Sequence, residues 1–269
     1  MWMKSQCFIL SCLAVCSAAA VTRVQVSIYE ESLCPACVGW FSGAFGPGTG
    51  AWAAYQTLGD GASTSIMDMD LFMWGNAKGD PMKNVSSFEC QHGPVECYAM
   101  KAENCARGLY SNADYLSFID CFDTTLIKTF PAGLPPGTVN MSFANTVVEQ
   151  CAKAPEDSLT TGSQLGACTA DGGDWKIYVN EAKLATPVHD AIPITKITWT
   201  EPNAHGSSII TNTSCPPPTN LIAFICDVWE ASGNVPHPNC SHTKAIDIGE
   251  RIATNNGIYS KWGTHSALN

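Results

Sequence analysis

The chain has 269 residues, of which 45% are hydrophobic and 14% are charged, and its formal net charge is −10 at pH 7. Nucleic acids and anionic membrane surfaces bind clustered lysines and arginines, and the 14 basic residues here are scattered, so we exclude both as partners. The composition is that of a globular protein long enough to bury a substantial core.

The first 20 residues have the pattern of a secretory signal peptide. Lys4 precedes an apolar run that ends in three alanines, and this run is shorter than the roughly 20 apolar residues that span a bilayer. We expect cleavage after Ala20, which makes Val21 the first residue of the mature chain. No later segment is apolar enough to cross a membrane, so we expect no membrane span.

The cysteines and the glycosylation sequons indicate the secretory pathway. Removing Cys7, Cys12 and Cys16 with the signal peptide leaves eleven of the 14 cysteines, a count typical of an oxidising compartment. Sequons for N-glycosylation indicate the same compartment, and they begin at Asn84, Asn140, Asn212 and Asn239. We therefore expect a glycoprotein.

The mature chain is predicted to open with a strand followed by a CxxC motif. Apolar and polar side chains alternate over residues 21–29, which is the period of a strand. A short loop leads to Cys34-Pro35-Ala36-Cys37, and we expect a helix to begin around this segment. A second strand is predicted over residues 66–74, where Asp68 and Asp70 are expected to face solvent.

Helical spacing of apolar side chains predicts helices over residues 110–128, 145–153 and 221–230. Residues 176–180 are interpreted as a strand. The segment 186–218 is rich in Pro, Thr, Asn and Ser and is interpreted as a long loop or insertion. Residues 241–269 show no clear period, so we expect a C-terminal tail there.

Two cysteines separated by two residues at the start of a helix can form a reversible disulfide. The helix N-terminus stabilises the thiolate of the first cysteine, so Cys34 is the expected nucleophile. Its thiolate would attack a substrate disulfide, and Cys37 would then displace the reduced substrate thiol. The alternatives are scaffold disulfides or a zinc site, and zinc is disfavoured because Cys90 and Cys97 are too far apart for an ordinary zinc knuckle.

The segment Cys90-Gln91-His92-Gly93-Pro94-Val95-Glu96-Cys97, followed by Cys105, resembles the signature of the gamma-interferon-inducible lysosomal thiol reductase (GILT) family, C-Q-H-G-x-x-E-C-x-x-N-x-x-x-x-C. Met100 departs from this pattern, because the family has Asn there. The upstream CxxC motif and Trp74-Gly75-Asn76-Ala77 extend the resemblance, which spans most of residues 24–240.

This resemblance implies an α/β protein, a thioredoxin-like fold with an inserted helical, disulfide-rich region, in one domain over residues 21–240. It implies catalysis by Cys34 and Cys37 without a cofactor or a metal. The implied partners are disulfide-bonded protein substrates and a small-molecule thiol reductant. The implied location is endosomal or lysosomal, at acidic pH, and secretion is the alternative.

A cis-proline usually faces the CxxC motif of thioredoxin-like enzymes, just before a strand. We place that position within residues 173–180, which contain no proline, and this predicts weaker substrate binding or a lower rate. Two further functions stay open. The missing proline leaves open a catalytically impaired, disulfide-rich secreted binding glycoprotein. A thiol oxidase or isomerase is also open, because Pro35-Ala36 does not fix the redox potential.

The remaining cysteines are expected to form structural disulfides. Their number is nine, which is odd, so one is expected to stay unpaired or to form an intermolecular bond. His92 and Glu96 are interpreted as structural residues rather than catalytic ones. The nine cysteines are Cys90, Cys97, Cys105, Cys121, Cys151, Cys168, Cys215, Cys226 and Cys240.

Overall fold

The computed structural model describes residues 23–43, 50–60, 64–83, 88–130, 139–152, 162–203, 206–218 and 220–240. The predicted signal peptide and the predicted C-terminal tail lie outside these residues. In the part of the chain that is described, no helix has both the length and the apolar character needed to cross a membrane.

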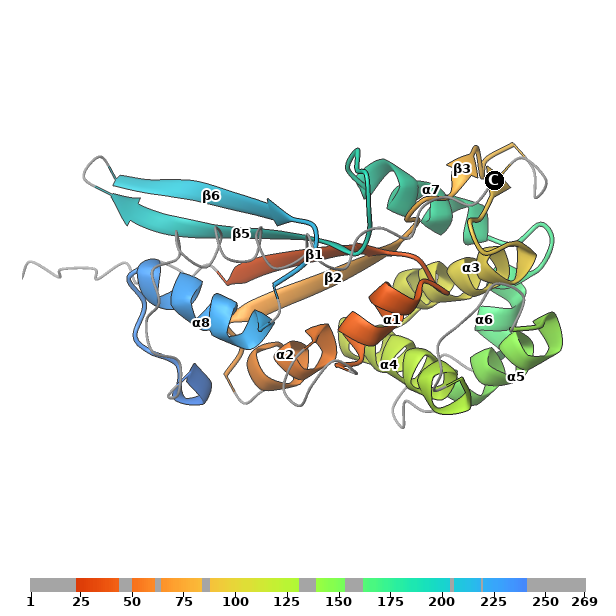
Figure 1. Cartoon of the computed structure of the whole chain (residues 1–269), viewed down its shortest axis with the longest axis horizontal. Helices are drawn as coiled ribbons and strands as arrows, with labels where there is room; N and C mark the ends of the chain where they lie inside the picture. The colour runs from red at the N-terminus through yellow and green to blue at the C-terminus, as the bar shows by residue number, and fades with distance from the viewer. Residues whose placement is uncertain are drawn as a thin grey trace, which may run out of the picture.

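A four-stranded mixed sheet forms the centre of the fold (Figure 1). Its strands lie in the order β2-β1-β5-β6, and β1 pairs in parallel with β2, whereas the β1–β5 and β5–β6 pairs are antiparallel. A parallel pair joined by a helical crossover and followed by an antiparallel hairpin is the thioredoxin-like arrangement. The predicted fold class is therefore confirmed. The strands are β1 (Val24–Glu30), β2 (Met67–Met73), β5 (Ile194–Asn203) and β6 (Gly206–Ser214).

Helices α1 (Pro35–Phe41) and α2 (Ala51–Leu58) connect β1 to β2. Helix α8 (Leu221–Ala231) follows β6 and packs against β1, β5 and α2, so α2 and α8 lie beside each other on one side of the sheet (Figure 1). The helices predicted over residues 110–128, 145–153 and 221–230 are confirmed as α4, α5 and α8.

Between β2 and β5 the chain inserts a helical region, as the thioredoxin-like interpretation expected (Figure 1). The short strands β3 (Lys78–Gly79) and β4 (Phe88–Glu89) pair at its start, and a 3-10 turn, η2 (Pro238–Cys240), follows α8. The inserted helices are α3 (Pro94–Leu109), α4 (Asn112–Thr129), α5 (Met141–Cys151), α6 (Gly162–Thr169) and α7 (Trp175–Ala185).

Disulfides connect eight of the nine structural cysteines, and three of the four bonds lie in the inserted region. Among the described residues, the free cysteines are Cys34, Cys37 and Cys215. The expectation that one structural cysteine stays unpaired is confirmed, with Cys215 as that residue. The bonds are Cys90–Cys97, Cys105–Cys168, Cys121–Cys151 and Cys226–Cys240.

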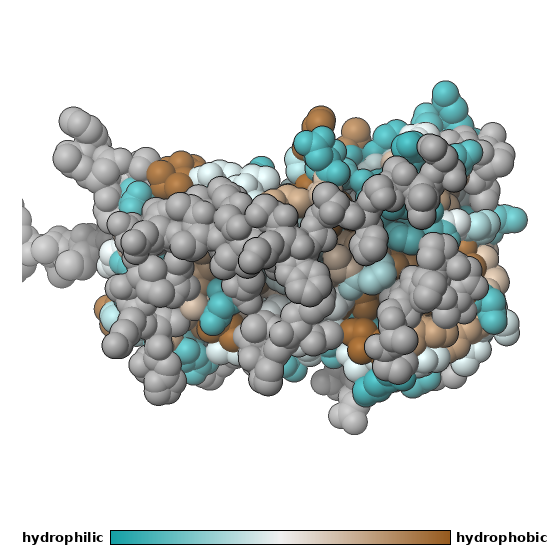
Figure 2. Space-filling model, in the orientation of Figure 1, coloured by the Kyte–Doolittle hydropathy of each residue, from teal (hydrophilic) through white to brown (hydrophobic). Residues whose placement is uncertain are grey.

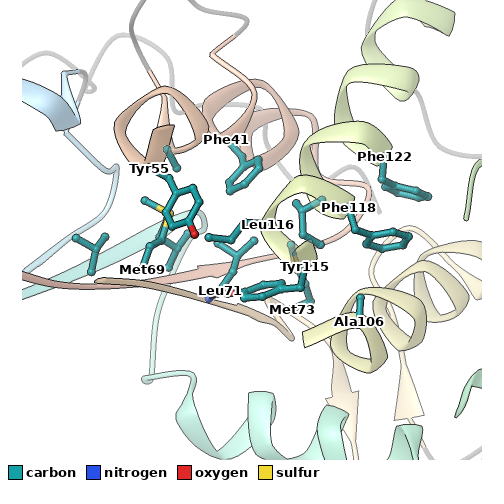
Figure 3. Close-up of a cluster of buried hydrophobic side chains, with 14 of the residues drawn as sticks. Phe41, Tyr55, Met69, Leu71, Met73, Ala106, Tyr115, Leu116, Phe118 and Phe122 are labelled. Atoms are coloured by element: carbon teal, nitrogen blue, oxygen red, sulfur yellow. Dashed lines mark hydrogen bonds between the residues drawn. The ribbon is translucent and has the colours of Figure 1, made fainter. Parts of the chain in front are cut away.

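The hydrophobic core lies between the sheet and the helices that cover it (Figure 3). Strand β2 buries alternate side chains, as the two-residue period in its sequence predicted. The close-up shows side chains of α1, α2, β2 and α4 meeting in one cluster, and the labelled members include Phe41, Tyr55, Met69, Leu71, Leu116 and Phe118.

On the face that Figure 2 shows, apolar and polar described residues are interspersed. Exposed large hydrophobic residues come from different elements, since Leu184 belongs to α7 and Ile209 to β6.

Two predictions for the second half of the chain, one of a strand and one of a loop, were wrong. Residues 176–180 belong to α7, in which Trp175, Val179 and Ala182 are buried at helical spacing. The segment 186–218 is not a long loop, because it contains β5 and β6, the antiparallel half of the sheet. Its threonines and isoleucines favour strands, and this preference outweighs the prolines.

The predicted absence of a cis-proline before a strand was also wrong. The Ile192–Pro193 peptide bond is cis, and Pro193 directly precedes β5. Ile194, the first residue of β5, pairs with Tyr29 near the end of β1. Pro193 therefore lies at the edge of the sheet from which the chain continues into the CxxC motif. The expected weakening of substrate binding loses its basis.

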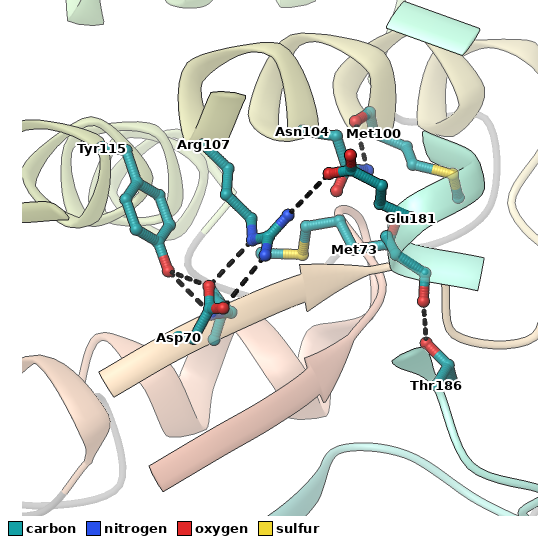
Figure 4. A network of polar contacts seen from close by, with 10 residues as sticks. Asp70, Met73, Met100, Asn104, Arg107, Tyr115, Glu181 and Thr186 are labelled. Carbon is teal, nitrogen blue, oxygen red and sulfur yellow. Dashed lines mark hydrogen bonds and ion pairs between the residues drawn. The ribbon is translucent and has the colours of Figure 1, made fainter. Parts of the chain in front are cut away.

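Asp70 is not merely a solvent-facing residue of its strand, as the sequence had suggested. Arg107 of α3 binds it, and the Tyr115 hydroxyl of α4 donates a hydrogen bond to Oδ1 at 3.2 Å (Figure 4). Glu181 of α7 lies 3.5 Å from Arg107. This network joins β2 to three of the inserted helices.

Candidate active site

The CxxC motif occupies the start of α1. Cys34 is the N-cap residue, with extended backbone angles, and Pro35 is in the first helical turn, where a proline removes no helix hydrogen bond. The backbone N–H of Cys37 donates a hydrogen bond to the Cys34 Sγ atom at 3.4 Å. The predicted start of a helix at this motif is thus confirmed, and the two sulfur atoms lie within one turn.

The surroundings shift the pKa values of the two thiols in opposite directions. Hydrogen bonding from Cys37 lowers the pKa of Cys34 below its usual value, although burial opposes this effect. Cys37 is fully buried, and desolvation raises its pKa well above the usual value. The site therefore favours a thiolate at Cys34 and a protonated thiol at Cys37.

Three carboxyl groups are buried close to the cysteines, on β1, α3 and α4. Glu30, Glu103 and Asp123 are each at most 2% exposed. Burial raises the pKa of Glu103 to about 8 and those of Glu30 and Asp123 well above their usual values. The Ser32 hydroxyl donates a hydrogen bond to Glu103 Oε2. Sequence reasoning missed this group, because its members are far apart in the chain.

A second group of titratable side chains surrounds Glu31, three residues before Cys34. The Glu31 Oε2 atom lies 3.9 Å from His92 Nδ1, and Glu96 Oε2 is in direct contact with the same nitrogen. Hydrogen bonding to Glu96 raises the pKa of His92. The pKa of Glu31 is raised to about 7, chiefly because the carboxyl is desolvated and secondly because the charge of Glu96 is close. The oxygen and nitrogen atoms of this group could also hold a metal ion.

Backbone and amide groups hold Glu31 in this position. The N–H of Asn76 donates to Glu31 Oε1 at 2.6 Å, and the Asn76 side chain donates to Gln91 Oε1 at 2.7 Å. Gly75 has a φ of +48°, and a Cβ atom there would lie 2.0 Å from Glu31 Cγ. Gly75, Asn76 and His92 belong to the segments that carry the family resemblance. All three lie next to the Glu31 carboxyl group, three residues before Cys34.

Met100, which departs from the family signature, is completely buried in α3. One turn later, the side chain of Asn104 donates hydrogen bonds to the Met73 carbonyl at 2.7 Å and to the Met100 carbonyl at 3.0 Å. The amide of Asn104 therefore connects α3 to the end of β2.

Cys215 and Trp40 each donate a hydrogen bond to a backbone carbonyl. Cys215 is exposed, donates a hydrogen bond to the Ala191 carbonyl at 3.2 Å, and has a pKa raised by partial burial. Trp40 is buried in α1, and its indole N–H donates to the Pro218 carbonyl at 3.2 Å. Trp40 therefore belongs to the core.

Residues 25–131 match the family model described as gamma interferon inducible lysosomal thiol reductase (GILT). GILT-like protein 1 of Drosophila melanogaster is 27% identical over 168 residues, which cover 57% of this chain and 62% of the relative. Gamma-interferon-inducible lysosomal thiol reductase of Carassius auratus is 31% identical over 106 residues, which cover 39% of this chain and 38% of the relative. The chain thus spans less than two thirds of either relative. The range matched by the family model contains the CxxC motif and the Cys90–Cys97 disulfide.

Proposed function

We propose that this chain, which belongs to the gamma interferon inducible lysosomal thiol reductase family, reduces disulfide bonds in protein substrates with Cys34 and Cys37. The observation that carries the proposal is the geometry of the helix start, where the Cys37 N–H donates to Cys34 Sγ and Cys37 itself is buried. The two thiol pKa values shift in opposite directions as a result. A nucleophile needs thiolate at working pH, whereas a resolving thiol is best kept protonated until the mixed disulfide forms.

The reaction transfers two electrons from the dithiol to the substrate. The Cys34 thiolate forms a bond to one substrate sulfur, and the substrate disulfide breaks, releasing the other sulfur as a thiolate that takes up a proton. Cys37 then loses its proton and attacks Cys34 Sγ. This step forms the Cys34–Cys37 disulfide and releases the second substrate thiol. A small-molecule thiol reductant restores the dithiol.

Glu30 is a buried carboxyl whose charge acts on the Cys37 thiol. Cys37 is 0% exposed, so its proton cannot pass directly to bulk water. The Glu30 carboxyl is 1% exposed, and within the described residues its Oε1 atom has no hydrogen-bond partner. Desolvation is the largest cause of the raised pKa of Cys37, and the Cys34 thiol is the next. The charge of Glu30 raises this pKa further. The Glu30 carboxylate therefore helps to keep the Cys37 thiol protonated.

We propose that the protein acts in an acidic compartment of the secretory route, an endosome or a lysosome. Secretion to the exterior of the cell is the alternative. The raised pKa of Glu103, about 8, supports an acidic site of action, because this buried carboxyl is neutral there. Protonated carboxyls are neutral, and neutral groups are buried at lower cost than charged ones. A lowered Cys34 pKa keeps thiolate available where ordinary thiols are protonated.

A reduction assay with the full mature chain tests the proposal. The pre-reduced protein is mixed with a denatured disulfide-bonded substrate at about pH 4.5 and about pH 7, where the thiolate fraction differs. We expect activity in the wild type and in Cys215→Ser, the matched control, and none in Cys34→Ser. Equal activity in Cys34→Ser would overturn the proposal. Inactivity of all three proteins would favour the impaired binding glycoprotein, and net oxidation of dithiol substrates would favour an oxidase.

A further inference from the structure

We propose that Glu31, His92 and Glu96 form a binding site for a divalent transition metal, with Zn²⁺ as the best chemical fit. Their potential ligand atoms all lie within 4.8 Å of one another. Two carboxylates and one imidazole, with a fourth position left for water, are a ligand set that zinc accepts. This inference goes beyond the proposed reductase function, because the metal site contains neither cysteine of the CxxC motif.

The buried carboxylate of Glu96 is the observation that points to a ligand. Its side chain is fully buried, and its Oε2 atom accepts a hydrogen bond from the His92 backbone N–H at 3.1 Å. Among the described residues, no partner is found for its second oxygen, Oε1, although a buried carboxylate oxygen is costly to leave unsatisfied. A metal ion bound by both oxygens of the Glu96 carboxylate would give Oε1 a partner.

The charges of the three residues also favour a cation. Glu31 is 1% exposed and Glu96 is 0% exposed, so two carboxylates share a nearly dry site. His92 supplies at most one positive charge. A dication would balance the second carboxylate, and it would occupy the space in which Nδ1 of His92 now contacts Glu96.

The surrounding structure fixes the positions of all three ligands. The Cys90–Cys97 disulfide closes the segment that carries His92 and Glu96, which are four residues apart. Glu31 Oε1 already accepts the Asn76 backbone N–H, which leaves Oε2 facing His92. Hydrogen bonds of this kind orient metal ligands in proteins and raise metal affinity.

Zinc binding by the oxidised protein tests the site separately from reductase activity. The sample carries Cys215→Ser and a closed Cys34–Cys37 disulfide, so it offers no free thiol among the described cysteines. Zn²⁺ is partitioned between the protein and a chromophoric chelator. We expect one equivalent to bind, and we expect His92→Gln and Glu96→Gln to weaken binding by about tenfold or more.

The matched control is Glu89→Gln, which changes an exposed carboxyl next to Cys90 and should leave zinc affinity unchanged. Co²⁺ provides a test that needs no ligand variant, because the paramagnetic ion broadens the NMR signals of nearby amides. Broadening centred on Glu31, His92 and Glu96 would support the site. The proposal is wrong if the oxidised protein binds no zinc, if both ligand variants bind zinc like the control, or if broadening is centred elsewhere.

Discussion

Arg107 of α3 and Asp70 of β2 form a two-point ion pair, in which Nε lies 2.8 Å from Oδ1 and Nη2 lies 3.0 Å from Oδ2 (Figure 4). The guanidinium group also lies over the Phe72 ring, with its Cζ atom 4.3 Å from the ring centroid. This pair attaches the inserted helical region to the thioredoxin-like sheet. Such planar two-point pairs have more favourable geometry than single contacts.

Replacing Arg107 by alanine should destabilise the protein. The change removes the paired hydrogen bonds and leaves Asp70 without its cation, so we expect the free energy of unfolding to fall by about 1–3 kcal/mol. Urea unfolding monitored by circular dichroism measures the difference. The control is Arg23→Ala, because Arg23 pairs with Asp60 and Asp68 where all three side chains are about 40% exposed. There the expected loss is about 0–1 kcal/mol, and equal losses in the two variants would contradict our interpretation.

The buried carboxyl of Glu103 should make the protein more stable in acid than at alkaline pH. Burial raises its pKa from 4.5 to about 8 in the folded state, so the folded protein binds this proton more tightly than the unfolded chain. The resulting stability is fully present below the unfolded pKa and is lost as the pH rises through about 8. We expect the melting temperature to fall between about pH 5 and about pH 8.

In Glu103→Gln this fall should be smaller, because the amide does not titrate. Glu149→Gln is the control, since Glu149 is an exposed carboxyl on α5, and it should keep the wild-type profile. If the melting temperatures of the wild type and Glu103→Gln change in parallel with pH, the pKa of Glu103 does not differ between the folded and unfolded states in this pH range.

Removing the charge of Glu31 should lower the pKa of Cys34. Hydrogen bonding from Cys37 has the largest effect on this thiol and lowers its pKa, whereas the Glu31 carboxylate raises it. In Glu31→Gln the thiolate loses a repulsive neighbour. The pH dependence of Cys34 alkylation, followed by mass spectrometry, should therefore shift to lower pH. Glu89→Gln should leave the profile in place, and an upward shift in Glu31→Gln would contradict this electrostatic interpretation.

Gly75 should tolerate alanine less well than another glycine with a positive φ. A Cβ atom at Gly75 would meet Glu31 Cγ at 2.0 Å, whereas at Gly172, with a φ of +87°, no heavy atom of the described residues lies within 4 Å. Both alanine variants have a similar backbone cost of about 1–2 kcal/mol. Only Gly75→Ala must also displace Glu31, so urea unfolding should show a larger loss of stability. Equal losses would mean that Glu31 moves freely.

The sequence predicted the elements whose pattern is local. Alternation in β1 and β2 and the position of Cys34 at a helix start were visible without the structure. The strand prediction for residues 176–180 failed because that window is too short to distinguish a two-residue period from a helical one. The wider spacing of Trp175, Val179 and Ala182 carries the helical signal.

Strands β5 and β6 were missed because prolines and polar residues in 186–218 resemble a loop, whereas pairing with β1 decides their conformation. The misplaced cis-proline followed from that error, since Pro193 stands just before β5. The carboxyl groups around the cysteines could not be predicted either. Glu31 and Glu96 are 65 positions apart in the sequence, and only the packing of α3 against the sheet brings them together.

The most direct test of the central claim is to trap the mixed disulfide between Cys34 and a substrate protein. If Cys34 attacks and Cys37 resolves, Cys37→Ser should accumulate a covalent complex with a disulfide-bonded substrate, visible on a non-reducing gel and lost on reduction. Mass spectrometry should locate the bond at Cys34. The double variant Cys34→Ser, Cys37→Ser should form no complex. A complex of equal yield in that double variant, or one bonded through Cys215, would contradict the assignment of Cys34 as the nucleophile.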